Sequence, residues 1–261
     1  TDGGGNCIAF NCDDDDNDGW PNECSTVDDG VHHVPSEYPT IQSAIEAAGF
    51  SDEVVIAPGT YTGNGDDAII NPGGKQLWIH SSDGPEVTII DGENVHAIVS
   101  CASGETNSTV IEGITITRSS GAGMSCVYSA PTVRNCIFNS NNVTAWLPFY
   151  GHTSGGLFCW HASPVIENCA FLNNDSGDSG GGIHCEDSNP ILTNCTFAKN
   201  SALSSGGGMY CEDSYPTIIE CTFSGNEASE GGGLYVDDAS NLYIENCEFA
   251  NNIADYGGGF H

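Results

Sequence analysis

The sequence contains very little positive charge. Its 261 residues include 4 Lys and Arg against 36 Asp and Glu, which gives a formal net charge of −32 at pH 7. Nucleic acids and anionic lipid surfaces attract proteins through cationic side chains. The composition therefore excludes a nucleic-acid partner and favours cations as counter-ions.

Long apolar runs and closely spaced cysteine pairs are also missing. No run approaches the ~20 residues that a membrane-spanning helix needs, so no transmembrane segment is expected. The 13 cysteines include no CxxC pair, which disfavours zinc and iron–sulfur ligation. Such a cysteine content is more typical of an oxidising compartment. We therefore expect a secreted protein, extracellular or at the cell surface.

What the sequence does contain is a repeat. Phe197, Phe223 and Phe249 lie 26 residues apart, and a glycine triplet follows each of them. Within a repeat, short alternating segments are separated by turns that leave no room for a hairpin, so each strand must pair with its equivalent in the next repeat. The pattern predicts a solenoid of parallel strands whose coils are about 4.8 Å apart.

Stacked repeats would place equal side chains above one another. We expect two buried ladders, one aromatic and one of asparagines whose amides link the coils. The ladders comprise Phe138, Phe171, Phe197, Phe223 and Phe249, and Asn141, Asn174, Asn200, Asn226 and Asn252.

Composition divides the chain in two. Residues 1–30 are rich in Asp, Gly and Cys and form a separate N-terminal segment, whereas residues 31–261 form the solenoid, with regular 26-residue coils from about residue 120. Residues 39–48 carry apolar side chains at helical spacing and end before Gly49. They predict one amphipathic helix at the N-terminal end of the solenoid.

These segments resemble a known superfamily. Residues 38–48 and 52–61 resemble the N-terminal cap and first coil of right-handed parallel β-helix proteins of the pectin-lyase-like superfamily. The Gly-Gly-aliphatic and Phe-x-x-Asn motifs resemble polymorphic outer-membrane adhesin repeats. The resemblance covers about residues 34–261. It implies an all-β, single-stranded, right-handed parallel β-helix with one capping helix. It leaves function open, because the superfamily includes lyases, glycosidases, epimerases, phage spikes and adhesins.

The N-terminal segment has the spacing of a calcium loop. Alternate carboxylates, a glycine at the sixth position and a following carbonyl are how a loop surrounds Ca²⁺. The proposed ligands are Asp14, Asp16, Asp18, the Trp20 carbonyl and Asn22. With the flanking cysteines as a disulfide, Cys12–Cys24, the segment resembles a thrombospondin type-3 calcium repeat. The alternative is a solvated acidic linker.

Eight cysteines of the solenoid form four pairs with the same internal spacing. This spacing fits either disulfides within each coil or two buried ladders of small apolar side chains. The disulfides would be Cys126–Cys136, Cys159–Cys169, Cys185–Cys195 and Cys211–Cys221. Cys101 and Cys247 have no such partner and are expected to be free.

Catalytic candidates are few. Arg118, His161 and His184 are the side chains available for acid–base work. Without a second catalytic partner, they are more simply explained as solvated surface. A loop at residues 144–152 carries Trp146, Phe149 and Tyr150, and together with Trp160 it is a candidate carbohydrate or partner site.

The sequence favours a non-catalytic function. We expect an extracellular or cell-surface β-helix, structural or adhesive, whose N-terminal segment binds Ca²⁺. The chain stops in mid-repeat at Gly257–His261. Either more chain follows or the end contacts another copy, which would give a head-to-tail filament. The alternative is a lyase or hydrolase that acts on an acidic polysaccharide.

Overall fold

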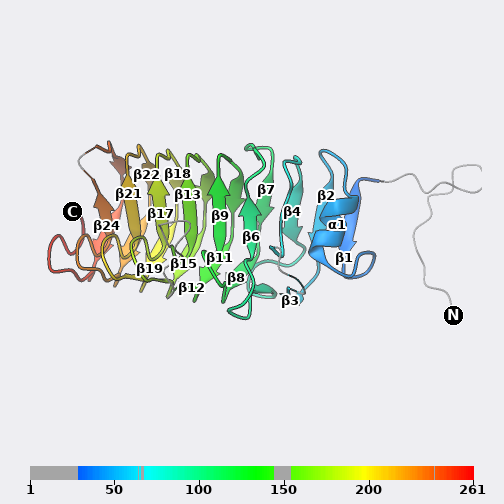
Figure 1. Ribbon diagram of the computed structural model, residues 1–261, viewed down its shortest axis with the longest axis horizontal. Coiled ribbons are helices and arrows are strands. Elements are labelled where there is room, and N and C mark those ends of the chain that lie inside the picture. The colour runs from blue at the N-terminus through cyan, green and yellow to red at the C-terminus, as the bar shows by residue number, and fades with distance from the viewer. Residues whose placement is uncertain (1–28, 64, 66–67, 144–153, 238) are drawn as a thin grey trace, which may run out of the picture.

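Three long parallel sheets run along the molecule and enclose its core (Figure 1). The computed structural model describes residues 29–63, 65, 68–143, 154–237 and 239–261. Every strand pairs with its equivalent in the neighbouring coil, and about eight coils stack into a rod. The predicted fold class, a right-handed parallel β-helix with one short helix, is confirmed.

Sheet 1 is the longest of these sheets. Its strands, in spatial order, are β1 (Val31–Val34), β2 (Glu53–Ile56), β4 (Trp78–Ser81), β7 (Val110–Glu112), β10 (Thr132–Arg134), β14 (Val165–Glu167), β18 (Ile191–Thr193), β22 (Thr217–Ile219) and β25 (Tyr243–Glu245).

Sheet 2 follows sheet 1 around each coil. Its strands are β3 (Gly59–Thr62), β5 (Thr88–Asp91), β8 (Thr115–Thr117), β11 (Ile137–Asn139), β15 (Ala170–Leu172), β19 (Thr196–Ala198), β23 (Thr222–Ser224) and β26 (Glu248–Ala250).

Sheet 3 completes the coil, and a small sheet 4 lies between sheets 2 and 3 along the chain. Sheet 3 contains β6 (Val99–Cys101), β9 (Met124–Val127), β13 (Leu157–Trp160), β17 (Ile183–Glu186), β21 (Met209–Glu212) and β24 (Leu234–Val236). Sheet 4 contains β12 (Asn142–Val143), β16 (Asp175–Ser176) and β20 (Ser201–Ala202).

The predicted helix is present as α1 (Ile41–Ala47), at the N-terminal end beside β1 and β2 (Figure 1). Thr40 is its N-cap, and its hydroxyl accepts a hydrogen bond from the Ser43 backbone N–H. Lys75 supports the other end, where its ammonium group donates to the carbonyls of Ile45, Glu46 and Ala48. The helix buries Ile41, Ala44 and Ile45 against the first coil.

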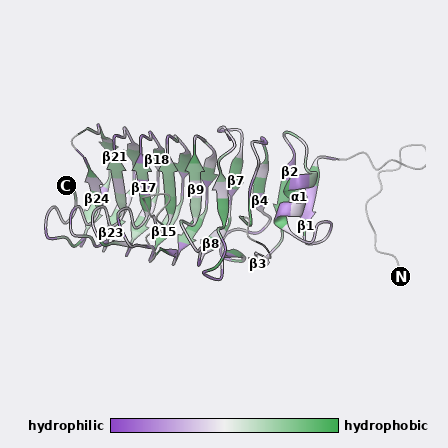
Figure 2. Cartoon of the chain, in the orientation of Figure 1, coloured by the Kyte–Doolittle hydropathy of each residue, from purple (hydrophilic) through white to green (hydrophobic). Residues whose placement is uncertain are grey.

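The core consists of stacked apolar rows, and hydrophobic segments gather in the strands (Figure 2). The expected phenylalanine ladder is confirmed. Consecutive rings from Phe138 to Phe249 lie nearly parallel, with centroids 4.7, 4.9, 4.5 and 4.8 Å apart. Stacked rings at this distance gain about 0.5–1.5 kcal/mol per pair beyond the burial of their area.

The asparagine ladder is confirmed as well, and it links the coils. The Asn200 side-chain amide donates to the Asn226 carbonyl oxygen Oδ1 at 3.0 Å and to the Phe171 backbone carbonyl at 2.9 Å. Its own Oδ1 accepts from the backbone N–H and the side-chain amide of Asn174. The amide therefore satisfies backbone groups at a corner that is completely buried.

Corners between sheets use left-handed backbone conformations. The corner between sheets 1 and 2 has Asn135, Asn168, Asn194 and Asn246 at φ of 52° to 55°, which asparagine tolerates better than most residues. Gly113, at φ 67°, occupies the same corner and separates β7 from β8. Residues 109–117 therefore contain two strands that belong to different sheets.

The cysteines form two ladders along the rod, which is one of the two alternatives for their spacing, and the four disulfides of the other alternative are not formed. The ten described cysteines are free thiols. The ladders are Cys101, Cys126, Cys159, Cys185 and Cys211 on sheet 3, and Cys136, Cys169, Cys195, Cys221 and Cys247 between sheets 1 and 2. The disulfides not formed are Cys126–Cys136, Cys159–Cys169, Cys185–Cys195 and Cys211–Cys221. Cys101 and Cys247 are free, as expected.

The two members of each expected pair lie on different sides of the coil. Cys126 is in register with Cys101 and Cys159 on sheet 3. Cys136 instead contacts the carbonyl of Arg134 through its Sγ, at 3.3 Å. Neighbours within a ladder also fit a disulfide poorly, because parallel strands are about 4.8 Å apart whereas bonded cysteines have Cβ atoms about 3.8 Å apart. The equal spacing of the cysteines thus reflects two buried positions in each coil, which form two ladders of small apolar side chains.

We predict that Asn200→Ala lowers the free energy of unfolding by about 2–3 kcal/mol, because it leaves buried backbone groups without partners. Asn241 is the control, since its side chain is exposed and its replacement by Ala is expected to change stability by less than about 0.5 kcal/mol. Urea denaturation measures both variants. Equal stabilities would contradict a structural role for the ladder.

Candidate functional site

The outer face of sheet 1 carries a group of polar contacts near its N-terminal end. Alternate residues of each strand point outward, so equivalent positions on successive coils form rows. One row contains His80, Glu112, Arg134 and Glu167, which are in register on β4, β7, β10 and β14. Glu112, Arg134 and Glu167 therefore carry charges of alternating sign along this part of the rod.

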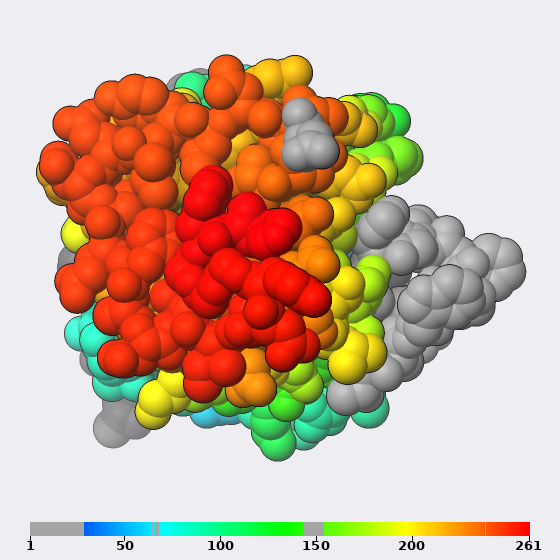
Figure 3. All heavy atoms as spheres, turned by 90° about the vertical axis from the view of Figure 1, so that its left-hand side faces the viewer, coloured from blue at the N-terminus to red at the C-terminus, as the bar shows by residue number. Residues whose placement is uncertain are grey.

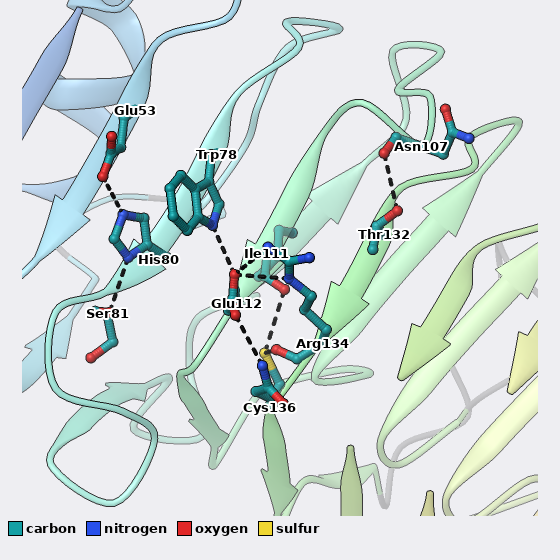
Figure 4. Close-up of polar contacts among 11 residues, drawn as sticks. Glu53, Trp78, His80, Ser81, Asn107, Ile111, Glu112, Thr132, Arg134 and Cys136 are labelled. Carbon is teal, nitrogen blue, oxygen red and sulfur yellow. Dashed lines mark hydrogen bonds and ion pairs between the residues drawn. The ribbon is translucent and has the colours of Figure 1, made fainter. Parts of the chain in front are cut away.

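His80 links its coil to the preceding one (Figure 4). Its Nε2 lies 2.7 Å from Glu53 Oε1, and its Nδ1 lies 3.0 Å from the Ser81 backbone carbonyl oxygen. Both partners are hydrogen-bond acceptors, so the ring satisfies both only when each nitrogen carries a proton. The ring also stacks on Trp78, with centroids 4.0 Å apart.

Glu112 connects three coils (Figure 4). Its Oε2 accepts a hydrogen bond from the Trp78 indole N–H at 2.9 Å and from Arg134 Nε at 2.8 Å. Its Oε1 accepts from the Asn135 amide at 2.9 Å. Such charge-assisted bonds are among the stronger ones in proteins. We call the group of Glu53, Trp78, His80, Glu112 and Arg134 the sheet 1 polar cluster.

The surroundings of Glu112 favour its ionised form. Burial alone would raise the pKa of this carboxyl group, but hydrogen bonds from Arg134, Trp78 and Asn135 outweigh burial and hold the pKa below its usual value. The cluster therefore contains a carboxylate that stays charged and fully bonded. Chemically it has the groups for acid–base work, yet each group is already occupied by a neighbouring side chain.

The three catalytic candidates from the sequence do not join this cluster. Arg118 follows β8 in sheet 2 and forms a bidentate ion pair with Asp91, on the neighbouring strand β5. Burial would raise the pKa of Asp91, but the bonds from Arg118 and from the Glu93 backbone N–H lower it. Arg118 is thus engaged in linking two coils.

The histidine candidates lie on or beside sheet 3. His161 lies at the corner after β13, where it stacks on Tyr128 with centroids 4.9 Å apart and lies 3.7 Å from Asp187. His184 is on β17, in register with Phe158, and is completely buried. The expectation that His184 belongs to the solvated surface is wrong, because aromatic neighbours and the glycine-rich segment before β17 cover it.

Several predicted site residues lie outside the described residues. These are the calcium ligands Asp14, Asp16, Asp18, Trp20 and Asn22, the cysteines Cys12 and Cys24, and the loop aromatics Trp146, Phe149 and Tyr150. Trp160 is described and is partly buried at the end of β13. Within the ranges that the structure describes, no group of three His, Cys, Asp or Glu side chains could hold a metal ion.

Sequence reasoning missed the sheet 1 polar cluster. Its residues come from the first coils, where loops of unequal length hide the repeat. The signal that could have revealed them is the alternation within residues 76–80 and 109–112, which places Trp78, His80 and Glu112 on the same face. The long-range pairs, such as Trp78 with Glu112, require the register that only the stacked strands provide.

We predict that Glu112 makes stability depend on pH. Its pKa is lower in the folded state than in the unfolded chain, so the stability it contributes is present above the unfolded value of about 4.5 and is lost as pH falls through the folded value. Glu112→Gln should be less stable than the native protein at pH 7, and the difference should shrink below pH 4. Urea denaturation between pH 3 and 7 measures it. Glu167→Gln, in the same row, is the control, and a pH-independent deficit for Glu112→Gln would contradict the assignment.

The family model that matches part of the chain agrees with the architecture. Residues 148–261 match the family model described as "Right handed beta helix region". A solved structure that is similar is the A-module of a mannuronan C-5 epimerase from Azotobacter vinelandii, with 12% identity and a TM-score of 0.38 over 82% of this chain and 72% of that chain. No curated protein matches the chain. The chain is therefore a right-handed parallel β-helix, by its strand pairing along the described coils and by family model over residues 148–261.

Proposed function

We propose that the protein is a non-catalytic β-helical rod with a structural or adhesive function outside the cell or at its surface. The observation that carries the proposal is that the few cationic side chains bond to other parts of the rod. Lys75, Arg118 and Arg134, three of the four Lys and Arg in the chain, bond to a neighbouring coil or to the capping helix. These side chains stiffen the rod instead of facing an open site.

The acidic surface supports the same function. Glu186 and Glu212 are in register on β17 and β21, so carboxylates repeat from coil to coil. The carboxylates within such a row repel one another unless cations or water screen their charges. An anionic polysaccharide would meet the same repulsion. A rod that repels other anions and whose coils are linked by side-chain bonds is suited to act as a spacer or an adhesive stalk.

Calcium binding belongs to the proposal through residues 14–22, whose ligand spacing is its support. The secreted location is proposed from the same N-terminal segment, where Cys12 and Cys24 would form a disulfide, because the ten cysteines of the described coils are free thiols and give no argument for an oxidising compartment. No helix in the described ranges is long and apolar enough to cross a membrane.

The alternative function is a lyase or hydrolase that acts on an acidic polysaccharide. The sheet 1 polar cluster is the observation that favours it, because a carboxylate, a histidine and an arginine lie beside Trp78, which is 40% exposed. Residues of these types are the usual general acids and bases.

The two functions differ in turnover. We expect no new reducing ends, no unsaturated products and no epimerised residues when the protein is incubated with pectate, alginate or neutral polysaccharides, with and without Ca²⁺. The reason is that the acid–base groups of the cluster are bonded to one another. Product formation that is abolished in Glu112→Gln and retained in Glu167→Gln would overturn the proposal in favour of the enzyme.

Head-to-tail self-association is the second part of the proposal. Figure 3 looks onto the C-terminal end, where the last coil covers the face of the rod. Apolar side chains of this coil are exposed, among them Ile244 at 40%, Ile253 at 60% and Phe260 at 52%. Strand edges that lack a partner pair readily with another chain. At the other end, β1 is the outermost described strand of sheet 1 and pairs with β2 alone.

We predict that this chain forms concentration-dependent oligomers and that Ile244→Glu weakens them, because a charge at the contact must be desolvated. Ile191→Glu is the matched control, since Ile191 is 45% exposed on sheet 1 in the middle of the rod. Sedimentation velocity over a range of concentrations measures the distribution. A monomer at every concentration, or equal effects of the two substitutions, would contradict end-to-end contact.

A further inference from the structure

An open hollow lies at the corner between sheets 3 and 1, beside the N-terminal half of the rod. Its volume is ≈ 480 Å³, within the range of small-molecule sites. It is lined by residues 104–107, 128–130, 161, 163 and 165, which come from three successive coils. Three coils span about 10 Å along the rod.

The hollow exists because these corners differ in length. Residues 102–109 connect β6 to β7 and form a long corner, whereas residues 128–131 and 161–164 make the next two corners short. Glu105 anchors the long corner, since its buried carboxylate accepts hydrogen bonds from the backbone N–H groups of Gly74 and Ser103 and from the Ser129 hydroxyl. The long corner therefore stands as a fixed wall above the two short ones.

Aromatic side chains line the short corners. Tyr128 is 60% exposed, stacks on His161 at an interplanar angle of 16°, and lies edge-on to Trp160 with centroids 5.2 Å apart. His161 occupies the position equivalent to Tyr128 in the next coil, and the two coils after that have an aspartate there, Asp187 and then Asp213, at the same left-handed φ. Aromatic rings thus occupy this position, where the later coils have an aspartate, in two of the three coils that line the hollow.

Two polar side chains that line the hollow have hydrogen-bonding groups without a partner among the described residues. The side-chain amide of Asn107 and the hydroxyl of Ser163 form no hydrogen bond with another described residue. An exposed ring in the same hollow as a free amide and a free hydroxyl offers an apolar face and directional hydrogen bonds to one ligand. Pyranose rings present the same combination, with one face of C–H groups and a rim of hydroxyl groups.

We propose that this hollow binds a neutral glycan, one of whose pyranose rings lies on Tyr128. The wall carries the charged carboxylate of Glu105, Asp187 lies beside His161, and the chain as a whole carries −32, so a polyuronate would be repelled. Binding is non-covalent and involves no turnover. The inference rests on the proposed function, for which it supplies the ligand class of the adhesive rod.

Titration with neutral and charged hexasaccharides tests the site. The probes are hexasaccharides of glucose, mannose and N-acetylglucosamine, with hexagalacturonate as the charged comparator, followed by saturation-transfer NMR and calorimetry. We expect at least one neutral probe to bind and hexagalacturonate not to bind. Tyr128→Ala should weaken binding about three- to tenfold, as the loss of one aromatic contact implies, and Tyr128→Phe should retain it.

Tyr215→Ala is the matched control, because Tyr215 is 55% exposed near the same corner two coils beyond the hollow. It should leave binding unchanged, and equal urea midpoints establish that the variants fold alike. The proposal is overturned if no neutral probe binds at millimolar concentration, if hexagalacturonate binds in preference, or if Tyr128→Ala and Tyr215→Ala behave alike. Absence of binding would overturn the glycan site and leave the proposed rod function unaffected. Degradation of a bound probe would overturn the non-catalytic function, although the hollow would still be a glycan-binding site.

Discussion

In-register stacking of equal side chains is the constraint on which the rest of this structure depends. A strand of three or four residues cannot form a stable sheet alone, so every strand obtains its partners from the coils on either side. The corners then have to be buried, and their backbone groups must find partners inside. The asparagine ladder meets this need because one amide supplies two donors and an acceptor, which join three coils at once.

The same constraint explains how the molecule uses its chemistry-bearing residues. A cysteine that is stacked on cysteines acts as a small buried apolar residue, and burial raises the pKa of the Cys185 thiol well above its usual value, so it stays protonated. Glu112 and Arg134 likewise meet because they occupy one row on successive coils. Their bonds to one another favour a rigid rod. Reactive groups in this fold are therefore best sought where a row is interrupted.

The corner hollow is such an interruption. Two coils replace the aspartate of later coils with Tyr128 and His161, and the coil before them has a long corner held by Glu105. Function is commonly added to repeat proteins on loops that the regular scaffold positions. The rod and the glycan site thus have separate origins in the structure, one in the regular coils and the other in their exceptions.

The sequence by itself determined the solenoid, the phenylalanine and asparagine ladders and the capping helix, since period and alternation depend on local spacing alone. It left the cysteine pairs undecided, because a spacing of ten residues says nothing about which side of a coil each residue occupies. The tertiary structure decided that the cysteines stack along the rod, that His184 is buried, and that Trp78, Glu112 and Arg134 meet on sheet 1. These outcomes depend on the register between coils of unequal length, which is fixed by strand pairing and core packing rather than by any one segment.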